Sequence, residues 1–253
     1  MKTRNFLWIC LLGALLGQTP ALGQIGLDND GPVISYHISY GLQWPGGDLA
    51  DKFGLNFNLS NAVEYMTPNN WIFGLKGAIL FGSEVFVDPL SGLRSPAGYI
   101  FADNFNIADI SLKERGMHLN ANFGKLIPVS ASNKRMGIRA TVGVGLLQHK
   151  VRVQEDPQAY VIQITGDYQK GYDELTNGLA LSQFIGFQYM GPSRRVNLYG
   201  GFEFVQAFTQ NRRDWDYFSF AKDATDRLDL LMGFRVGLFL PFYLETDPEE
   251  IRY

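Results

Sequence analysis

The chain has 253 residues, a formal net charge of −3 and a mean hydropathy close to zero. So small a charge argues against a nucleic-acid partner, and the mean hydropathy argues against a bundle of membrane-spanning helices. Aromatic residues make up 14% of the chain and glycines number 28, a composition that favours β structure, in a single domain at this length.

Residues 1–23 have the three parts of a secretory signal peptide. Lys2 and Arg4 form a basic start, an apolar stretch follows, and a site of small residues ends at Gly23. The apolar stretch is about a dozen residues long, whereas a membrane-spanning helix needs about 20. We therefore expect cleavage after Gly23, followed by a short periplasmic lead over residues 24–32.

The cysteine content limits the chemistry of the mature chain. Cys10 is the only cysteine and lies within the expected signal peptide. The mature chain would then have no thiol, which excludes disulfides, thiolate metal sites and cysteine nucleophiles. We expect no cofactor.

From residue 33 onward, apolar side chains recur at every second position. In residues 33–44 the apolar face consists of Ile34, Tyr36, Ile38, Tyr40, Leu42 and Trp44. Side chains of a β-strand alternate between its two faces, so each such segment predicts a strand with one apolar face. The expected strands are, in chain order, residues 33–44, 53–66, 71–84, 116–127, 135–151, 178–190, 196–209 and 228–242.

Short and long connections alternate between these segments. The second, fourth and sixth connections are tight turns, whereas residues 85–115, 152–177 and 210–227 form long loops. This alternation is typical of outer-membrane barrels, which have short periplasmic turns and longer extracellular loops. Aromatic residues at both ends of the strands match the two interfacial girdles of such barrels.

Residues 228–242 show the pattern most clearly. The even positions are all apolar, whereas the odd positions include Asp229 and Arg235. A period of two excludes a helix, and an open sheet would leave an unpaired edge in hydrocarbon. The sequence thus predicts an all-β fold, an eight-stranded antiparallel up-and-down transmembrane β-barrel over residues 33–243 in the cell outer membrane. Residues 244–253 would be a periplasmic tail.

The faces opposite the apolar ones define the expected interior. Its ionic network comprises Glu64, Lys76, Glu84, Arg139, Glu203, Asp229 and Arg235, and its histidines are His37, His118 and His149. An eight-stranded barrel is only wide enough for its own side chains. We therefore expect a neutralised network that fills the interior and leaves no aqueous pore.

The same interior also allows a catalytic interpretation. Ser182, His118, His149 and Glu84 are expected near the outer ends of their strands. A Ser/His/carboxylate set hydrolyses acyl esters, and a His/His/Glu set holds a metal. Neither set has the spacing of G-x-S-x-G or H-E-x-x-H, so we expect the chain not to be an enzyme.

The last long loop contains a basic and aromatic group. Arg212, Arg213, Trp215 and Tyr217 are a candidate extracellular contact for lipopolysaccharide or for another envelope protein. Residues 166–172 of the preceding loop are candidates to pack beside them.

Four segments, together with the closing strand, carry a resemblance to a known family. They are residues 46–53 (GGDLADKF), 108–116 (ADISLKERG), 145–150 (GLLQHK) and 227–231 (RLDLL). The chain resembles a family of outer-membrane β-barrels of the Bacteroidota, of the eight-stranded OmpA/OmpX-like type. The resemblance implies no activity, but it suggests the hypothesis that the chain is an accessory barrel in a secretion or surface-export assembly.

Three functions follow as hypotheses. The first is a non-enzymatic structural or partner-binding envelope protein in contact with outer-membrane lipid. The second is a small outer-membrane barrel that acts on, or binds, lipid or lipopolysaccharide. The third is a soluble lipocalin-like barrel, which would need an apolar interior and a polar exterior, the reverse of the pattern above.

Overall fold

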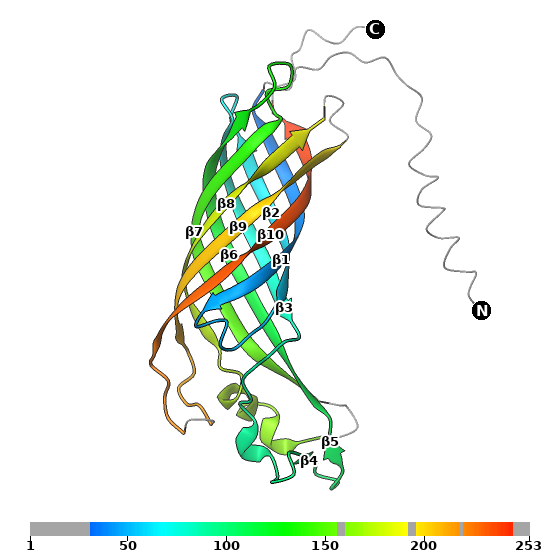
Figure 1. Ribbon diagram of the computed structural model, residues 1–253, viewed down its shortest axis with the longest axis vertical. Helices are drawn as coiled ribbons and strands as arrows, with labels where there is room; N and C mark the ends of the chain where they lie inside the picture. Colours follow the sequence, from blue (N-terminus) through cyan, green and yellow to red (C-terminus); the bar gives the residue numbers. More distant parts are fainter. Residues whose placement is uncertain (1–30, 156–159, 192–195, 218–219, 245–253) are drawn as a thin grey trace, which may run out of the picture.

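A computed structural model describes residues 31–155, 160–191, 196–217 and 220–244. These residues form a closed barrel in which the ring order is β1-β10-β9-β8-β7-β6-β3-β2 (Figure 1). The expected eight-stranded antiparallel fold is confirmed. The expected signal peptide, most of the periplasmic lead and all of the tail except Leu244 lie outside the described residues.

The barrel strands follow the expected segments closely along the chain. Their bounds are β1 (Val33–Gly47), β2 (Asn56–Met66), β3 (Trp71–Gly82), β6 (Ile110–Pro128), β7 (Gly137–Glu155), β8 (Thr176–Met190), β9 (Asn197–Asn211) and β10 (Asp226–Tyr243). Two short strands, β4 (Ile100–Phe101) and β5 (Ile107–Ala108), form a separate hairpin. Three short 3₁₀ helices are η1 (Ser91–Leu93), η2 (Ile162–Ile164) and η3 (Tyr168–Gly171).

The first and last strands close the ring in antiparallel register. Ile38 lies opposite Leu238, and Ser39 lies opposite Gly237. Because the register keeps like faces together, apolar Ile38 and Leu238 both project outward. None of the helices in the described part of the chain is long and apolar enough to cross a membrane.

The outer surface is an apolar band. Exposed side chains along it include Ile38, Leu75, Ile79, Val142, Ile185, Phe234 and Leu238. One polar residue on this band is satisfied locally, because the Tyr36 hydroxyl donates to Asn61 Oδ1 at 2.7 Å on the neighbouring strand. The interior carries the charged groups, so the barrel has the polarity of a membrane protein and the opposite of a lipocalin.

The fourth and fifth barrel strands are longer than expected. β6 and β7 pair over their full length, from Ile110 opposite Glu155 to Pro128 opposite Gly137. The neighbouring β3 ends at Gly82, opposite Glu114, so the far end of this hairpin projects beyond the barrel (Figure 1). The prediction of an irregular loop over residues 85–115 was therefore wrong at its end.

The second strand begins later than expected, and this reverses the position of Phe53. The sequence predicted Phe53 on the outer face, but residues 48–55 form a turn and β2 starts only at Asn56. Phe53 is 1% exposed and packs with Leu49, Leu147 and Leu231 inside the loop-side mouth. The turn thus folds a hydrophobic plug into the barrel.

Candidate functional site

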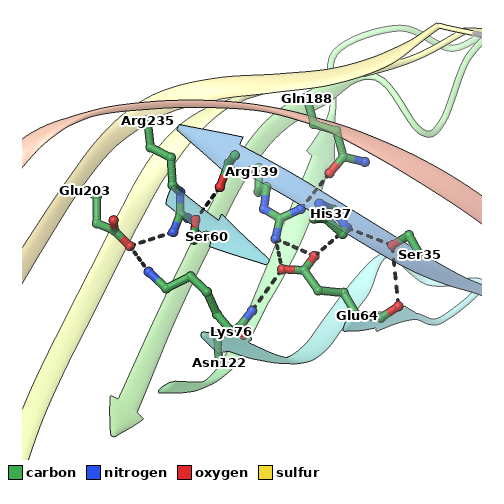
Figure 2. Close-up of polar contacts among 11 residues, drawn as sticks. Ser35, His37, Ser60, Glu64, Lys76, Asn122, Arg139, Gln188, Glu203 and Arg235 are labelled. Carbon is green, nitrogen blue, oxygen red and sulfur yellow. Dashed lines mark hydrogen bonds and ion pairs between the residues drawn. The ribbon is translucent and has the colours of Figure 1, made fainter. Parts of the chain in front are cut away.

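The barrel interior holds two ion clusters (Figure 2). In the first, Arg139 Nη2 lies 2.5 Å from both carboxylate oxygens of Glu64, and His37 Nε2 lies 3.2 Å from Glu64 Oε2. In the second, Glu203 accepts from Arg235 Nη1 at 2.7 Å and from the Lys76 ammonium. All these side chains are buried. The carboxylates and guanidinium groups of the two ion clusters come from four different strands, β2, β7, β9 and β10.

Aromatic rings pack against the cations on one side. The Arg235 guanidinium lies 4.5 Å from the Phe184 ring centroid, and that of Arg139 lies 5.0 Å from the Tyr199 centroid. His37 stacks on Phe239 with ring centroids 4.9 Å apart. Cation–π contacts favour a desolvated guanidinium, so these rings hold the cations in place as well as filling space.

The interior is filled. The space beside Lys76, Glu203 and Arg235 measures about 10 Å³, which is about the room that one water molecule needs. Apolar clusters lie above and below the ion clusters, with Leu147 and Leu231 toward the loops and Ile72 and Leu126 toward the turns. The described part of the barrel therefore has the packed interior expected of eight strands.

Two of the residues assigned to one network lie elsewhere. Asp229 accepts from Thr209 Oγ1 at 2.5 Å and lies 2.8 Å from His149 Nε2, under the hydrophobic plug and apart from the central clusters. Glu84 is outside the interior. It follows the end of β3, is exposed, and accepts from the Leu55 backbone N–H at 2.9 Å. Its assignment to the lumen was wrong, because the chain leaves the strand two residues earlier than expected.

The candidate catalytic residues do not meet. The Ser182 hydroxyl accepts from the Asn120 amide, and His149 is paired with Asp229. His118 is buried, and its Nε2 atom has no hydrogen-bond partner in the described structure. Within the described ranges, no cluster of three or more His, Cys, Asp or Glu side chains is arranged to hold a metal.

Sequence reasoning missed one buried charge at the periplasmic end. Arg135 is fully buried beneath the barrel, where Nη1 donates to the Thr67 carbonyl at 3.0 Å and to Asn70 Oδ1 at 2.8 Å. Its Nη2 atom donates to the carbonyl of Gly31, just before β1. Arg135 thus fastens two periplasmic turns to the start of the barrel. Its position two residues before Gly137, in phase with inward-facing Gly137 and Arg139, was the available signal.

Beyond the barrel, the long connections fold together into a body that we call the platform. It comprises residues 86–112, 152–155, 160–175 and 212–217. Its apolar core consists of Leu90, Ile100, Ala102, Ala108, Val153, Val161, Ile164 and Tyr172, with Leu93, Ile110, Leu112 and Tyr217 packed against it. The projecting ends of β6 and β7 supply part of this core, so the platform is built onto the barrel's own strands (Figure 1).

The four residues of the candidate extracellular contact have different roles in the platform. Arg213 binds Asp173 through Nε at 2.7 Å and Nη2 at 2.5 Å, and this hydrogen bonding raises the pKa of Arg213. Tyr217 packs on Tyr172 with centroids 5.0 Å apart, and its N–H donates to the Gly171 carbonyl at 3.0 Å. The expected packing of residues 166–172 beside this loop is confirmed.

The other two members of that group are more accessible. Arg212 is exposed and donates from Nε to Asn177 Oδ1 at 2.7 Å, and Trp215 is exposed at the surface. Arg213 and Tyr217 therefore hold the platform together, and only Arg212 and Trp215 present surface to a partner.

A second group of apolar side chains on the platform faces solvent. We call it the apical patch: Tyr99, Phe101, Phe105, Ile107, Tyr160 and Ile162. The β4–β5 hairpin turns Ile100 and Ala108 into the core, so the alternate residues Phe101 and Ile107, which pair across the strands, point outward. The Asp103 N–H donates to the Tyr160 carbonyl at 3.0 Å, so the segment that contains Tyr160 and Ile162 lies alongside the hairpin. Both faces of this hairpin are thus apolar, and only one of them is covered.

Phe105, at the turn of the hairpin, is the most exposed of these side chains. It is 88% exposed, and its φ of 63° lies in the left-handed region that non-glycine residues seldom adopt. Backbone bonds on both sides hold this conformation, from Phe105 N–H to the Ala102 carbonyl and from Ala102 N–H to the Asn106 carbonyl, each 2.9 Å. The turn therefore holds an aromatic ring in solvent at a local conformational cost.

No protein-family model matches the chain, and a search of curated proteins finds no match. Among solved structures, Neisserial surface protein A matches 83% of this chain and 97% of its own length, with 12% identity and a TM-score of 0.44. The Yersinia pestis attachment invasion locus protein Ail matches 83% and 99%, with 12% identity and a TM-score of 0.41. The outer membrane protein AlkL matches 92% and 100%, with 12% identity and a TM-score of 0.38.

The chain's own architecture agrees with an outer-membrane location. Closed barrels with an apolar outer band, short turns at one end and long loops at the other are the form in which β-sheets cross bacterial outer membranes. This chain has all three features. It is an outer-membrane β-barrel, and its platform lies on the side of the long loops, which in such barrels is extracellular.

Proposed function

We propose that this chain is a non-enzymatic outer-membrane barrel that anchors a folded extracellular platform for binding a partner protein through the apical patch. The observation that carries the proposal is the β4–β5 hairpin, whose covered face stabilises the platform while its uncovered face displays Phe101, Phe105 and Ile107. Contiguous exposed apolar side chains on a folded surface mark interaction sites. Aromatic side chains in particular supply the binding energy of protein interfaces.

The filled interior supports an anchoring role over transport. A barrel packed with ion clusters between two apolar layers gives a rigid base and offers no path for a solute. The dispersal of Ser182, His149 and Glu84 among separate partners supports the non-enzymatic proposal over one that acts on lipid or lipopolysaccharide. Kinship with Bacteroidota barrels stays a prediction, as does membership of a secretion or surface-export assembly. If both hold, the partner is another envelope protein or an exported protein.

Site-specific photo-cross-linking tests the proposal in intact outer membranes. A photo-reactive amino acid at position 105 should give one adduct of defined mass, because a specific partner buries that ring. The matched control is position 170, a platform residue whose Lys170 side chain is 61% exposed but polar.

The same adduct should be lost when Phe101→Ser and Ile107→Ser are introduced together. Both side chains project outward, so the platform should keep its protection from protease in this variant. Equal labelling at positions 105 and 170, or an adduct that survives the double substitution, would contradict the proposal.

A further inference from the structure

Four basic side chains gather on the outer surface of the β6–β7 hairpin, where the hairpin begins to project beyond its neighbours (Figure 1). We call them the basic array, which consists of Lys113, Arg115, Lys150 and Arg152. Strand alternation puts the two residues from β6 on the face of exposed Met117, and the two from β7 on the face of exposed Leu146. The array therefore continues the outer surface of the barrel toward the loops.

The strand register places these cations directly opposite one another. Lys113 lies opposite Arg152, and Arg115 lies opposite Lys150. Like charges in opposed positions of an antiparallel pair are destabilising. The hairpin's other outward positions in this stretch are uncharged, namely Ser111, Met117, Gln148 and Gln154. The outer face of the hairpin thus has no acid of its own that could offset the repulsion.

The rest of the chain supplies little counter-charge. Lys113 Nζ donates to a glutamine side chain at 3.0 Å, and Arg115 Nη1 donates to the preceding backbone carbonyl at 2.6 Å. Lys150 Nζ lies 3.3 Å from the Asp173 carboxylate, but both oxygens of that carboxylate already accept from Arg213. Within the described ranges, no ion pair joins the other three cations of the array to a carboxylate. Their charge is available to an anion outside the chain.

The lipid-facing part of β6 ends just below the array. Its outward side chains extend from Ile127, next to the periplasmic turn, to Met117, and both of these are exposed. The stretch matches the roughly 9–11 residues that a tilted strand needs to cross the hydrocarbon. Its one charged side chain, Lys125, lies over the Trp71 ring at the turn end. Arg115 is the next outward residue toward the loops, which puts the array at the level of the outer-leaflet headgroups.

We propose that the basic array binds the phosphate groups of lipopolysaccharide, the glycolipid of the outer leaflet, at the base of the platform. Arginine and lysine are the side chains that bind phosphate oxygens, arginine through two parallel N–H donors. A phosphate between opposed cations also removes their repulsion. The position beside the apolar band favours a lipid phosphate over a soluble anion, because the acyl chains of the same molecule then lie against that band. The proposal is independent of the apical patch.

Titration of the purified protein with lipopolysaccharide tests the proposal, in uncharged detergent and with EDTA present so that no divalent cation bridges two anions. Lys113→Gln with Arg152→Gln removes one opposed pair. It should weaken binding by about fivefold for each cation removed, the usual effect of one basic residue at an anionic membrane surface. Lys170→Gln with Lys222→Gln is the matched control, because these side chains are also exposed on the long loops and the net charge changes equally. Its affinity should equal that of the parent.

Two further comparisons identify the ligand chemistry. Lys113→Arg with Arg152→Lys keeps both charges and should bind like the parent, which separates the loss of charge from any change in fold. Lipopolysaccharide without its phosphate groups should bind the parent as weakly as intact lipopolysaccharide binds the double glutamine variant. Inositol hexakisphosphate, a soluble polyphosphate without acyl chains, should bind the parent more weakly than intact lipopolysaccharide does.

Three results would overturn the proposal. An equal loss of affinity in the matched control would mean that lipopolysaccharide follows net charge and not the array. Equal binding of the intact and the dephosphorylated glycolipid would show that the phosphates are not the ligand. Inositol hexakisphosphate that binds as tightly as lipopolysaccharide, and loses affinity in the double glutamine variant, would assign the array to a soluble anion.

Discussion

Arg139 and Glu64 form a paired contact across the barrel interior, with one guanidinium nitrogen 2.5 Å from both carboxylate oxygens. Arg139 also donates to Gln188 Oε1 at 3.0 Å, and Glu64 accepts from the Asn122 amide at 3.2 Å. Buried charges are tolerated only when they are paired in this way. β2 and β7 are not neighbours in the ring, so this ion pair crosses the interior to join them. It therefore holds the two strands at a fixed separation and also neutralises the two buried charges.

Replacing one member of this pair should therefore destabilise the barrel strongly. Glu64→Gln leaves the Arg139 guanidinium buried without its counter-charge, and we expect a loss of about 3–5 kcal/mol in the free energy of unfolding. Urea unfolding in lipid vesicles, followed by tryptophan fluorescence, measures it. Glu84→Gln is the control, because that exposed carboxylate lies outside the interior. A Glu64→Leu, Arg139→Leu double variant should recover most of the loss; if Glu64→Gln alone unfolds like the parent, the pair has no stabilising role.

The hydrogen bond between Tyr36 and Asn61 on the lipid face should be measurable. Tyr36→Phe removes the hydroxyl and leaves the Asn61 amide unpaired against hydrocarbon, which should cost about 1 kcal/mol. Adding Asn61→Leu should restore the stability of the parent, because both partners are then apolar. The same unfolding measurement distinguishes the two variants. Equal stability of Tyr36→Phe and the parent would argue against this bond in the membrane.

Gly171 should be essential to the order of the platform. A Cβ atom at this position would lie 2.0 Å from Cδ2 of Tyr217, in the contact that joins the two long loops. We expect Gly171→Ala to separate these loops and to expose the platform to trypsin in whole cells, while the barrel keeps its strand content. Gly92→Ala is the control, since a Cβ there meets nothing within 4 Å. Equal protease resistance of the two variants would show that the loops adjust to the added methyl group.

The purified protein should not conduct ions. Apolar layers lie on both sides of the ion clusters, and the space between them is about the size of one water molecule. In planar bilayers we expect no stable channel at any voltage that the membrane withstands. Reproducible unitary conductance from pure protein would require the plug of Leu49 and Phe53 to leave the mouth, and it would contradict the packed interior.

Alternation in the sequence was enough to predict the barrel, because a period of two assigns each side chain to one face once the strand is recognised. It failed at the ends of strands. Phe53 and Glu84 both continue the alternating pattern, but Phe53 lies before the start of β2 and Glu84 lies after the end of β3, so Phe53 is buried inside and Glu84 is exposed outside. A regular pattern does not record where backbone pairing stops.

Most of the platform's core was beyond the reach of the same reasoning. Its core is made of residues from three connections, and no local period marks which of them meet. The packing of residues 166–172 beside the Tyr217 loop was expected, but the sequence did not predict that Leu90, Ile100 and Ala102 of an earlier connection complete the same core.

The continuity of β6 and β7 from barrel to platform has a mechanical consequence. A pull on the platform from outside the cell acts along these two strands together, so it loads in shear the backbone hydrogen bonds that join β6 to β3 and β7 to β8, with many bonds sharing the force at once. A tether attached through a flexible loop would instead let the platform peel away from its base. Tension on the platform is thus carried into the wall of the barrel.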